Sequence, residues 1–285
     1  MAGPEHAPGV GERLSSLPER HRAFLERALA AAPGVDGLVG LAAGGSFLAG
    51  EIDEFSDLDL ILAVEPAIWP EVLDRGGAIA GELDPSFLAG FSGEHVGEPR
   101  LLVCLYGPPL LHVDLKFVSL DDVHERIEDP VILWEVDGRL SAAFARTESR
   151  HPRADPTWIE DRFWIWAHYL ADKIERGELF EALDGLAFLR AQVLGPLAFR
   201  RAGVDATGVR RIESRVPGFA TELERTVAGV DAASCAAALE AAIELYTELR
   251  EAGGAEASSV EVSAIEREVR LYVAGLSDRL GPGDP

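Results

Sequence analysis

The feature that most constrains this chain is the stretch of residues 44–60, GGSFLAGEIDEFSDLDL. It begins with a Gly-Gly-Ser turn, passes a further glycine at Gly50, and ends in Ser56-Asp57-Leu58-Asp59 running into the apolar sequence LILAV. The apolar runs at residues 38–43 and 58–64 predict buried strands on either side. A turn whose backbone amides can bind an anion is therefore followed closely by two carboxylates on a strand.

Asp57 and Asp59 are two residues apart on this predicted strand, so their side chains point to the same face. Two neighbouring carboxylates in a partly buried site repel one another unless a positive charge lies between them. Mg²⁺ is the natural partner, because it takes oxygen ligands from one or two carboxylates together with substrate phosphates. The alternative is that one aspartate caps a turn and the other is solvated.

A third acid lies on a later strand. Residues 111–118, LHVDLKFV, alternate, which places His112, Asp114 and Lys116 on one face and apolar side chains on the other. From the middle of such a strand, Asp114 can share the metal or accept a proton from an attacking hydroxyl. The alternative is an aspartate on a solvated face of the sheet.

The remaining pattern predicts an α+β architecture, in which a mixed β-sheet with flanking helices is followed by an all-α helical part. Residues 131–136 fit either a strand or a short helix. Residues 1–14 are expected to be flexible, 15–148 to form the sheet domain and 149–285 the helical domain. Helices are expected at 17–32, from near Phe47, at 66–76, 157–176, 179–202, 217–228, 232–252 and 259–280, and further strands at 100–106 and 111–118.

The charge balance is strongly acidic, with 49 Asp and Glu against 26 Lys and Arg and a formal net charge of −23. Such a surface repels a phosphate-rich polymer and attracts a cationic small molecule, although acidity can also serve only to keep a protein soluble. No apolar run approaches the length of a membrane span, and residues 1–14 do not have the pattern of a signal peptide. Cys104 and Cys235 are expected to be buried and unpaired, which fits a reducing cytoplasm.

Taken together, Gly45-Ser46, Gly50, Ser56-Asp57-Leu58-Asp59-Leu60 and the later strand around Asp114 resemble the DNA polymerase β-type nucleotidyltransferase superfamily. The spacing fits the pattern GS-x3-G-x5-SDxDL without a gap, and the resemblance covers roughly residues 38–118. In its domain organisation the chain is similar to the small antibiotic nucleotidyltransferases, which act on aminoglycosides or lincosamides and append a helical domain to the catalytic one.

The resemblance implies that Gly45 and Ser46 hold a triphosphate, that Asp57 and Asp59 bind Mg²⁺, and that Asp114 is a metal ligand, a general base or both. The hydroxyl of Ser56 is a further candidate donor to the nucleotide. Many members carry a basic residue just after the Gly-Ser turn, where this chain has Phe47-Leu48-Ala49. Lys173, on the aromatic-rich predicted helix 157–176, is a candidate for the missing cation.

We therefore expect a cytoplasmic, Mg²⁺-dependent enzyme that transfers a nucleoside monophosphate from ATP or another nucleoside triphosphate to a hydroxyl of a small, cationic acceptor such as an antibiotic. No nucleic-acid or membrane partner is expected, and the chain is expected to be a monomer or a homodimer. Two alternatives stay open: a nucleotidyltransferase that acts on a protein or a tRNA, and a non-catalytic nucleotide-binding module of the same fold.

Overall fold

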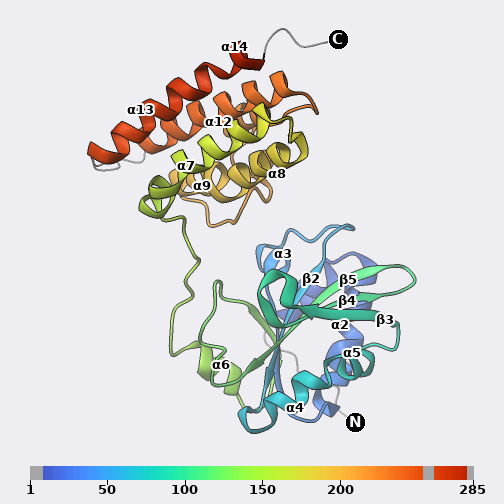
Figure 1. Ribbon diagram of the computed structural model, residues 1–285. Helices are drawn as coiled ribbons and strands as arrows, with labels where there is room; N and C mark the ends of the chain where they lie inside the picture. The colour runs from blue at the N-terminus through green and yellow to red at the C-terminus, as the bar shows by residue number, and fades with distance from the viewer. Residues whose placement is uncertain (1–8, 253–259, 281–285) are drawn as a thin grey trace. The chain divides into compact units, whose positions relative to one another are not determined.

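The computed structural model describes residues 9–252 and 260–280. They form two compact units that divide between His151 and Pro152 (Figure 1). The first unit contains the sheet and the second is helical, so the α+β fold class expected from the sequence is confirmed.

The first unit is built on a six-stranded mixed sheet with the order β3-β4-β5-β2-β1-β6. Strands β2 and β5 are parallel, and each of the other neighbouring pairs is antiparallel. The predicted strands at 38–43 and 58–64 are confirmed, and the ambiguous run after residue 130 is a strand. The bounds are β1 Leu38–Ala43, β2 Leu58–Val64, β3 Phe87–Gly93, β4 Glu98–Tyr106, β5 Leu111–Ser119 and β6 Val131–Glu135.

The two faces of the sheet are covered differently. On one face the even-numbered positions of β2 pack into a large apolar core with α1, α2 and α5. The opposite face carries Ala63 and Val118, which pack with Leu140 and Ala143 of α6 at one end. Asp59 alternates with the core residues of β2 and so belongs to this second face. The helices are α1 Val10–Ser15, α2 Glu19–Ala31, α3 Gly45–Ala49, α4 Trp69–Asp74, α5 Gly76–Leu83 and α6 Arg139–Phe144.

The predicted flexible segment 1–14 falls largely outside the described residues. Residues 10–15 of this segment and its continuation form helix α1, which buries Val10 and Leu14, at 1% and 5% exposure, in the same core as α2. The last residues, 281–285, also lie outside the described part.

The second unit is a bundle of helices around one core, with α7, α8 and α12 contributing many of its buried residues. Phe163 of α7 stacks on Tyr246 of α12 with ring centroids 3.7 Å apart. Arg250 of α12 bonds Glu160 of α7 at 3.0 Å and Glu266 of α13 at 2.9 Å. The helices are α7 Pro156–Glu175, α8 Leu179–Leu189, α9 Gly195–Ala202, α10 Ile212–Arg215, α11 Pro217–Leu223, α12 Ala232–Ala252, α13 Val260–Ala274 and α14 Leu276–Leu280.

Whereas no apolar run of the sequence was expected to approach the length of a membrane span, the stretch Leu179–Ala202 of this bundle is long and apolar enough to cross a membrane by length and composition. Half of its 18-residue apolar window is buried inside the structure. Leu186, Leu189 and Phe199 from this stretch belong to the core of the second unit. The apolar character of the stretch is therefore accounted for by its packing in the bundle.

Candidate functional site

The site is organised around two aspartates on neighbouring strands. Asp59 of β2 and Asp114 of β5 are register partners in the parallel pairing of these strands. Register partners lie on the same face, and paired strands are about 4.8 Å apart, so the two carboxylates share one patch of the sheet. Both residues are partly exposed, as a site open to a substrate requires. Asp57 lies just before β2 and is also partly exposed.

The Gly44-Gly45 turn lies against Asp59. The Gly44 N–H donates to the carbonyl oxygen of Asp59 at 2.9 Å, which fixes the turn to β2. Gly45 has a φ of +56°, and a Cβ added to it would lie 2.1 Å from Oδ2 of Asp59. Glycine is required at position 45 both for its left-handed backbone and for the close approach of the carboxylate. The resemblance placed the triphosphate at Gly45 and Ser46, and Ser46 is 7% exposed.

Glu128 also reaches this turn, which was not predicted from the sequence. Its Oε1 accepts a hydrogen bond from the Gly45 N–H at 2.6 Å, and a Cβ on Gly44 would lie 2.4 Å from the same atom. Glu128 comes from the segment between β5 and β6. The Gly45 amide, which was expected to bind phosphate, therefore donates to a carboxylate in this structure. This contact shows that the amide is placed to bind an anionic acceptor.

Ser56 is part of a tight turn that leads into Asp57. The Asp53 N–H donates to Ser56 Oγ at 3.0 Å, and Ser56 Oγ donates to Asp53 Oδ1 at 3.1 Å. The Phe55 N–H donates to the same carboxylate oxygen at 2.8 Å. The hydroxyl of Ser56 thus shapes the loop, and its predicted contact with a nucleotide stays a prediction.

Strand β5 carries polar groups on the face of Asp114, and the predicted alternation is confirmed by its burial. His112 Nε2 lies 2.9 Å from Asp114 Oδ1. Farther along, Lys116 bonds Glu98 of β4 at 2.7 Å, and Glu98 also accepts from Arg100 at 2.7 Å. The hydrogen bond from Arg100, reinforced by Lys116, lowers the pKa of Glu98 to about 2. The polar face is therefore held by charge pairs on the side away from β2.

Lys173, the candidate cation, lies on α7 in the second unit. Its ammonium bonds Glu178 at 2.5 Å and lies 5.0 Å from the centre of the Tyr169 ring. The hydrogen bond to Glu178 raises the pKa of Lys173. A role for Lys173 in binding the triphosphate stays a prediction, and it would require the ammonium to exchange Glu178 for phosphate.

Within residues 9–252 and 260–280, no group of three or more His, Cys, Asp or Glu side chains is placed to hold a metal ion. Mg²⁺ in phosphate-transfer sites is held by one or two carboxylates, and the substrate phosphates complete its coordination. Asp59 and Asp114 supply two such carboxylates on adjacent strands. Their chemistry fits Mg²⁺ in the presence of a nucleotide, with Asp57 as a further candidate ligand.

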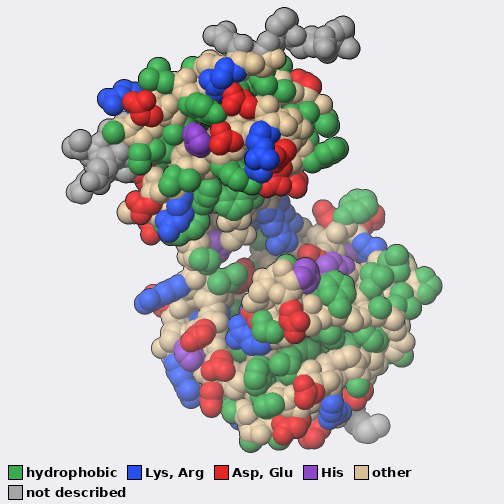
Figure 2. Space-filling model, viewed as in Figure 1, with side chains coloured by type: hydrophobic (Ala, Val, Ile, Leu, Met, Phe, Trp, Pro, Cys, Tyr) green, Lys and Arg blue, Asp and Glu red, His purple; other side chains and the backbone are tan. Residues whose placement is uncertain are grey.

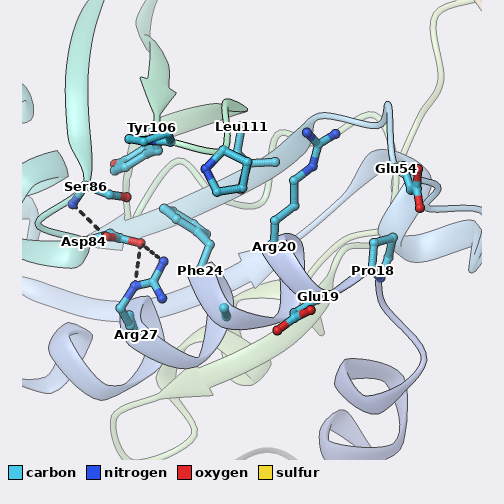
Figure 3. A pocket seen from close by; sticks show the side chains of 14 residues that line it. Pro18, Glu19, Arg20, Phe24, Arg27, Glu54, Asp84, Ser86, Tyr106 and Leu111 are labelled. Atoms are coloured by element: carbon cyan, nitrogen blue, oxygen red, sulfur yellow. Dashed lines mark hydrogen bonds and ion pairs between the residues drawn. The ribbon is translucent and has the colours of Figure 1, made fainter.

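A cavity of about 640 Å³ lies on the helix-covered side of the first unit (Figure 3). Phe24 of α2 and Tyr106 of β4 meet edge to face in its wall, with ring centroids 4.7 Å apart. Elsewhere in the lining, Arg27 bonds the buried Asp84 at 2.6 Å. The lining residues include none of the residues predicted to form the catalytic site.

Both cysteines are buried and unpaired, as predicted. Burial raises the pKa of the Cys104 thiol to about 12, which leaves it protonated and unreactive at neutral pH.

No family model matches the sequence, and no curated protein matches it. Among solved structures, the chain is similar to an aminoglycoside 6-adenyltransferase from Bacillus subtilis, with 13% identity, a TM-score of 0.37, and coverage of 89% of this chain and 97% of that one. It is also similar to a nucleotidyltransferase-like protein from Exiguobacterium sibiricum 255-15, with 14% identity, a TM-score of 0.28, and coverage of 91% and 89%.

Proposed function

We propose that this chain is a Mg²⁺-dependent nucleotidyltransferase. It would move a nucleoside monophosphate, AMP from ATP in the first instance, to a hydroxyl group of a small cationic acceptor such as an aminoglycoside-like antibiotic. The observation that carries the proposal is the convergence of three elements at one place: Asp59, its register partner Asp114, and the Gly44-Gly45 turn pressed against the Asp59 carboxylate.

Each of these groups has a role in such a transfer. The amides of the turn and the hydroxyl of Ser46 bind phosphate oxygens, because they donate hydrogen bonds that an anion accepts. Asp57, Asp59 and Asp114 would hold Mg²⁺, which would supply charge neutralisation for the phosphates. The proposal needs no covalent enzyme intermediate.

In the transfer, the acceptor hydroxyl attacks the α-phosphorus, the bond from that phosphorus to the bridging oxygen breaks, and pyrophosphate leaves. The proton of the hydroxyl passes to Asp114, which lies 2.9 Å from His112. In the tautomer with the hydrogen on Nε2, His112 donates to the Asp114 carboxylate and holds its geometry. Catalysis would rest mainly on positioning and charge neutralisation, as in other phosphoryl chemistry.

The preference for a cationic acceptor rests on the acidic balance of the chain, with its formal net charge of −23. On the face seen in Figure 2, basic side chains are interspersed with acidic ones, without a continuous basic area of the kind that binds nucleic acid. The helical unit would select the acceptor. We further propose that the protein is cytoplasmic, that it is a monomer or a homodimer, and that it acts in antibiotic resistance.

The test is a screen of ATP, GTP, CTP and UTP against a panel of aminoglycosides and lincosamides, read by pyrophosphate release and by the mass of the modified acceptor. We expect acceptor-dependent release that requires Mg²⁺. Asp36→Asn, at an exposed position in the turn before β1, is the matched control for aspartate variants in the site. Absence of release with every nucleotide and acceptor, together with no Mg²⁺-dependent nucleotide binding by calorimetry, would remove the proposal.

A further inference from the structure

A buried histidine contacts the loop that carries the catalytic motif. His21 lies on α2 and is 0% exposed. Its Nε2 is 2.8 Å from the carbonyl oxygen of Ser56, the residue directly before Asp57. A helix near the start of the chain therefore holds the backbone at the point where the motif begins.

The hydrogen-bond partner of Nε2 defines which tautomer the His21 ring adopts. A carbonyl oxygen only accepts hydrogen bonds, so Nε2 carries the hydrogen and donates it. Nδ1 is buried and has no hydrogen-bond partner among the described residues. An apolar side chain would fill this position without burying a bare nitrogen, which indicates that the contact with Ser56 is the reason for a histidine here.

The loop is fixed from its other side as well. The Glu51 N–H donates to the carbonyl oxygen of Ser46 at 3.0 Å, which ties the start of the loop to the glycine turn. Near its end, Asp53 and Ser56 bond one another through side chain and backbone. His21 supplies the bond from the body of the unit, so the backbone at Ser56 is held from two directions.

We propose that His21 is a positioning residue for Asp57: its Nε2–H fixes the Ser56 carbonyl, and through the next peptide unit it sets where the Asp57 carboxylate meets the metal. The inference rests on the proposed function for its consequence in catalysis. Its structural part, that His21 orders residues 51–57, stands independently of the reaction.

Two substitutions at His21 test whether a hydrogen-bond donor at the place of Nε2 is what orders the loop. The amide nitrogen of glutamine can take the place of Nε2, whereas the shorter asparagine places its amide nitrogen where Nδ1 lies. We expect His21→Gln to keep the bond to Ser56 and His21→Asn to lose it. His95→Asn, at an exposed histidine of the same unit, is the matched control. If His21→Asn does not fold, His21→Leu replaces it as the variant without a donor.

Three measurements then decide the inference. In His21→Asn the kcat should fall about 10-fold and the half-saturating Mg²⁺ concentration should rise, with KM for the acceptor unchanged, as for other residues that orient a metal ligand. His21→Gln should restore both values. Hydrogen exchange at the amides of residues 51–58 should be faster in His21→Asn, and close to wild type in His21→Gln and His95→Asn.

A folded His21→Asn or His21→Leu variant with wild-type exchange at residues 51–58 overturns the inference. So does a variant with faster exchange there but unchanged kcat and Mg²⁺ dependence. If the wild-type protein transfers no nucleotide, the proposed function fails, and the exchange measurement still decides whether His21 orders the loop.

Discussion

Asp59 and Asp114 are register partners across the parallel pair β2 and β5, so two carboxylates from distant parts of the chain lie side by side on one face of the sheet. The Gly44-Gly45 turn closes over the first of them, and Gly45 has no room for a Cβ because Oδ2 of Asp59 occupies that position. This relationship determines which substitutions should abolish activity and which should only weaken it.

We first predict that Asp59→Asn and Asp114→Asn each reduce nucleotide transfer about 100-fold or more, because each removes a charge that offsets the metal and, at Asp114, the proton acceptor. Pyrophosphate release under saturating substrate measures the loss. Asp36→Asn should remain at the wild-type rate. Full activity in either site variant would contradict the assigned roles.

The second prediction concerns the two glycines around α3. Gly45→Ala combines a left-handed backbone, φ +56°, with a Cβ that would lie 2.1 Å from the Asp59 carboxylate. Gly50→Ala has a similar φ of +69° but no atom within 4 Å of its Cβ. Backbone strain costs about 1–2 kcal/mol in both, so only Gly45→Ala should also displace Asp59 and weaken nucleotide binding.

Chemical denaturation gives the stability of the two glycine variants, and calorimetry with ATP and Mg²⁺ gives their affinity. Equal losses of affinity in the two variants would mean that the turn tolerates a side chain at position 45. The comparison thus isolates the contact with Asp59 from the general cost of the backbone conformation.

Third, Glu128→Gln should tighten nucleotide binding about 10-fold. In this structure the carboxylate of Glu128 accepts from the Gly45 N–H, the donor assigned to phosphate, so the two anions compete for one amide. A neutral amide competes less well, because hydrogen bonds to charged acceptors are the stronger ones. Glu125→Gln, an exposed position on the same segment, is the control. Weaker binding in Glu128→Gln would instead make Glu128 part of the metal site.

The fourth prediction is a pH dependence of stability from Glu98. The pKa of this carboxyl is about 2 in the folded protein against 4.5 as its ordinary value, chiefly because Arg100 donates to it. Because the pKa is lower in the folded state, the carboxylate stabilises the folded protein at pH values above the unfolded pKa. This contribution is lost as the pH falls toward 2. Glu98→Gln should therefore cost about 1 kcal/mol at pH 7, a value reduced for partial solvent screening.

Urea unfolding of wild type and Glu98→Gln at pH 7, 5 and 3 measures the difference in their free energies of unfolding. This difference should be smaller at pH 3 than at pH 5 and 7. Glu94→Gln, an exposed carboxylate on the turn before β4, should show no such trend. A difference that stays constant over this range would show that the pairing of Glu98 with Arg100 and Lys116 does not stabilise the fold.

Much of the fold was accessible from local pattern. Alternation along residues 111–118 predicted the strand and the side of Asp114, and the bounds of β1 and β2 follow from their apolar runs. Strand β3 was not predicted, because as an edge strand it is exposed at most positions and shows no alternation.

The site was predictable only where its chemistry is local. Gly45, Asp57 and Asp59 lie within one short motif, and their spacing indicates a phosphate and a metal. Glu128 and His21 reach the same region through tertiary packing, from a loop and a helix far away in the sequence. Nothing in a glutamate before Asp129-Pro130, or in a histidine on an amphipathic helix, marks such a contact. The parallel pairing that unites Asp59 with Asp114 is likewise a property of the assembled sheet.

That parallel pairing also links the site to the order in which the sheet is completed. Strands β3, β4 and β5 can form as a meander from neighbouring segments, whereas β2 reaches β5 only after the intervening chain has folded back. Pairings of this kind carry a large loop-closure cost and form late in folding. The two carboxylates therefore come together only through a pairing between segments far apart in the sequence. A ligand that bridges them would select the fully folded molecule and raise its thermal stability in proportion to the logarithm of ligand concentration.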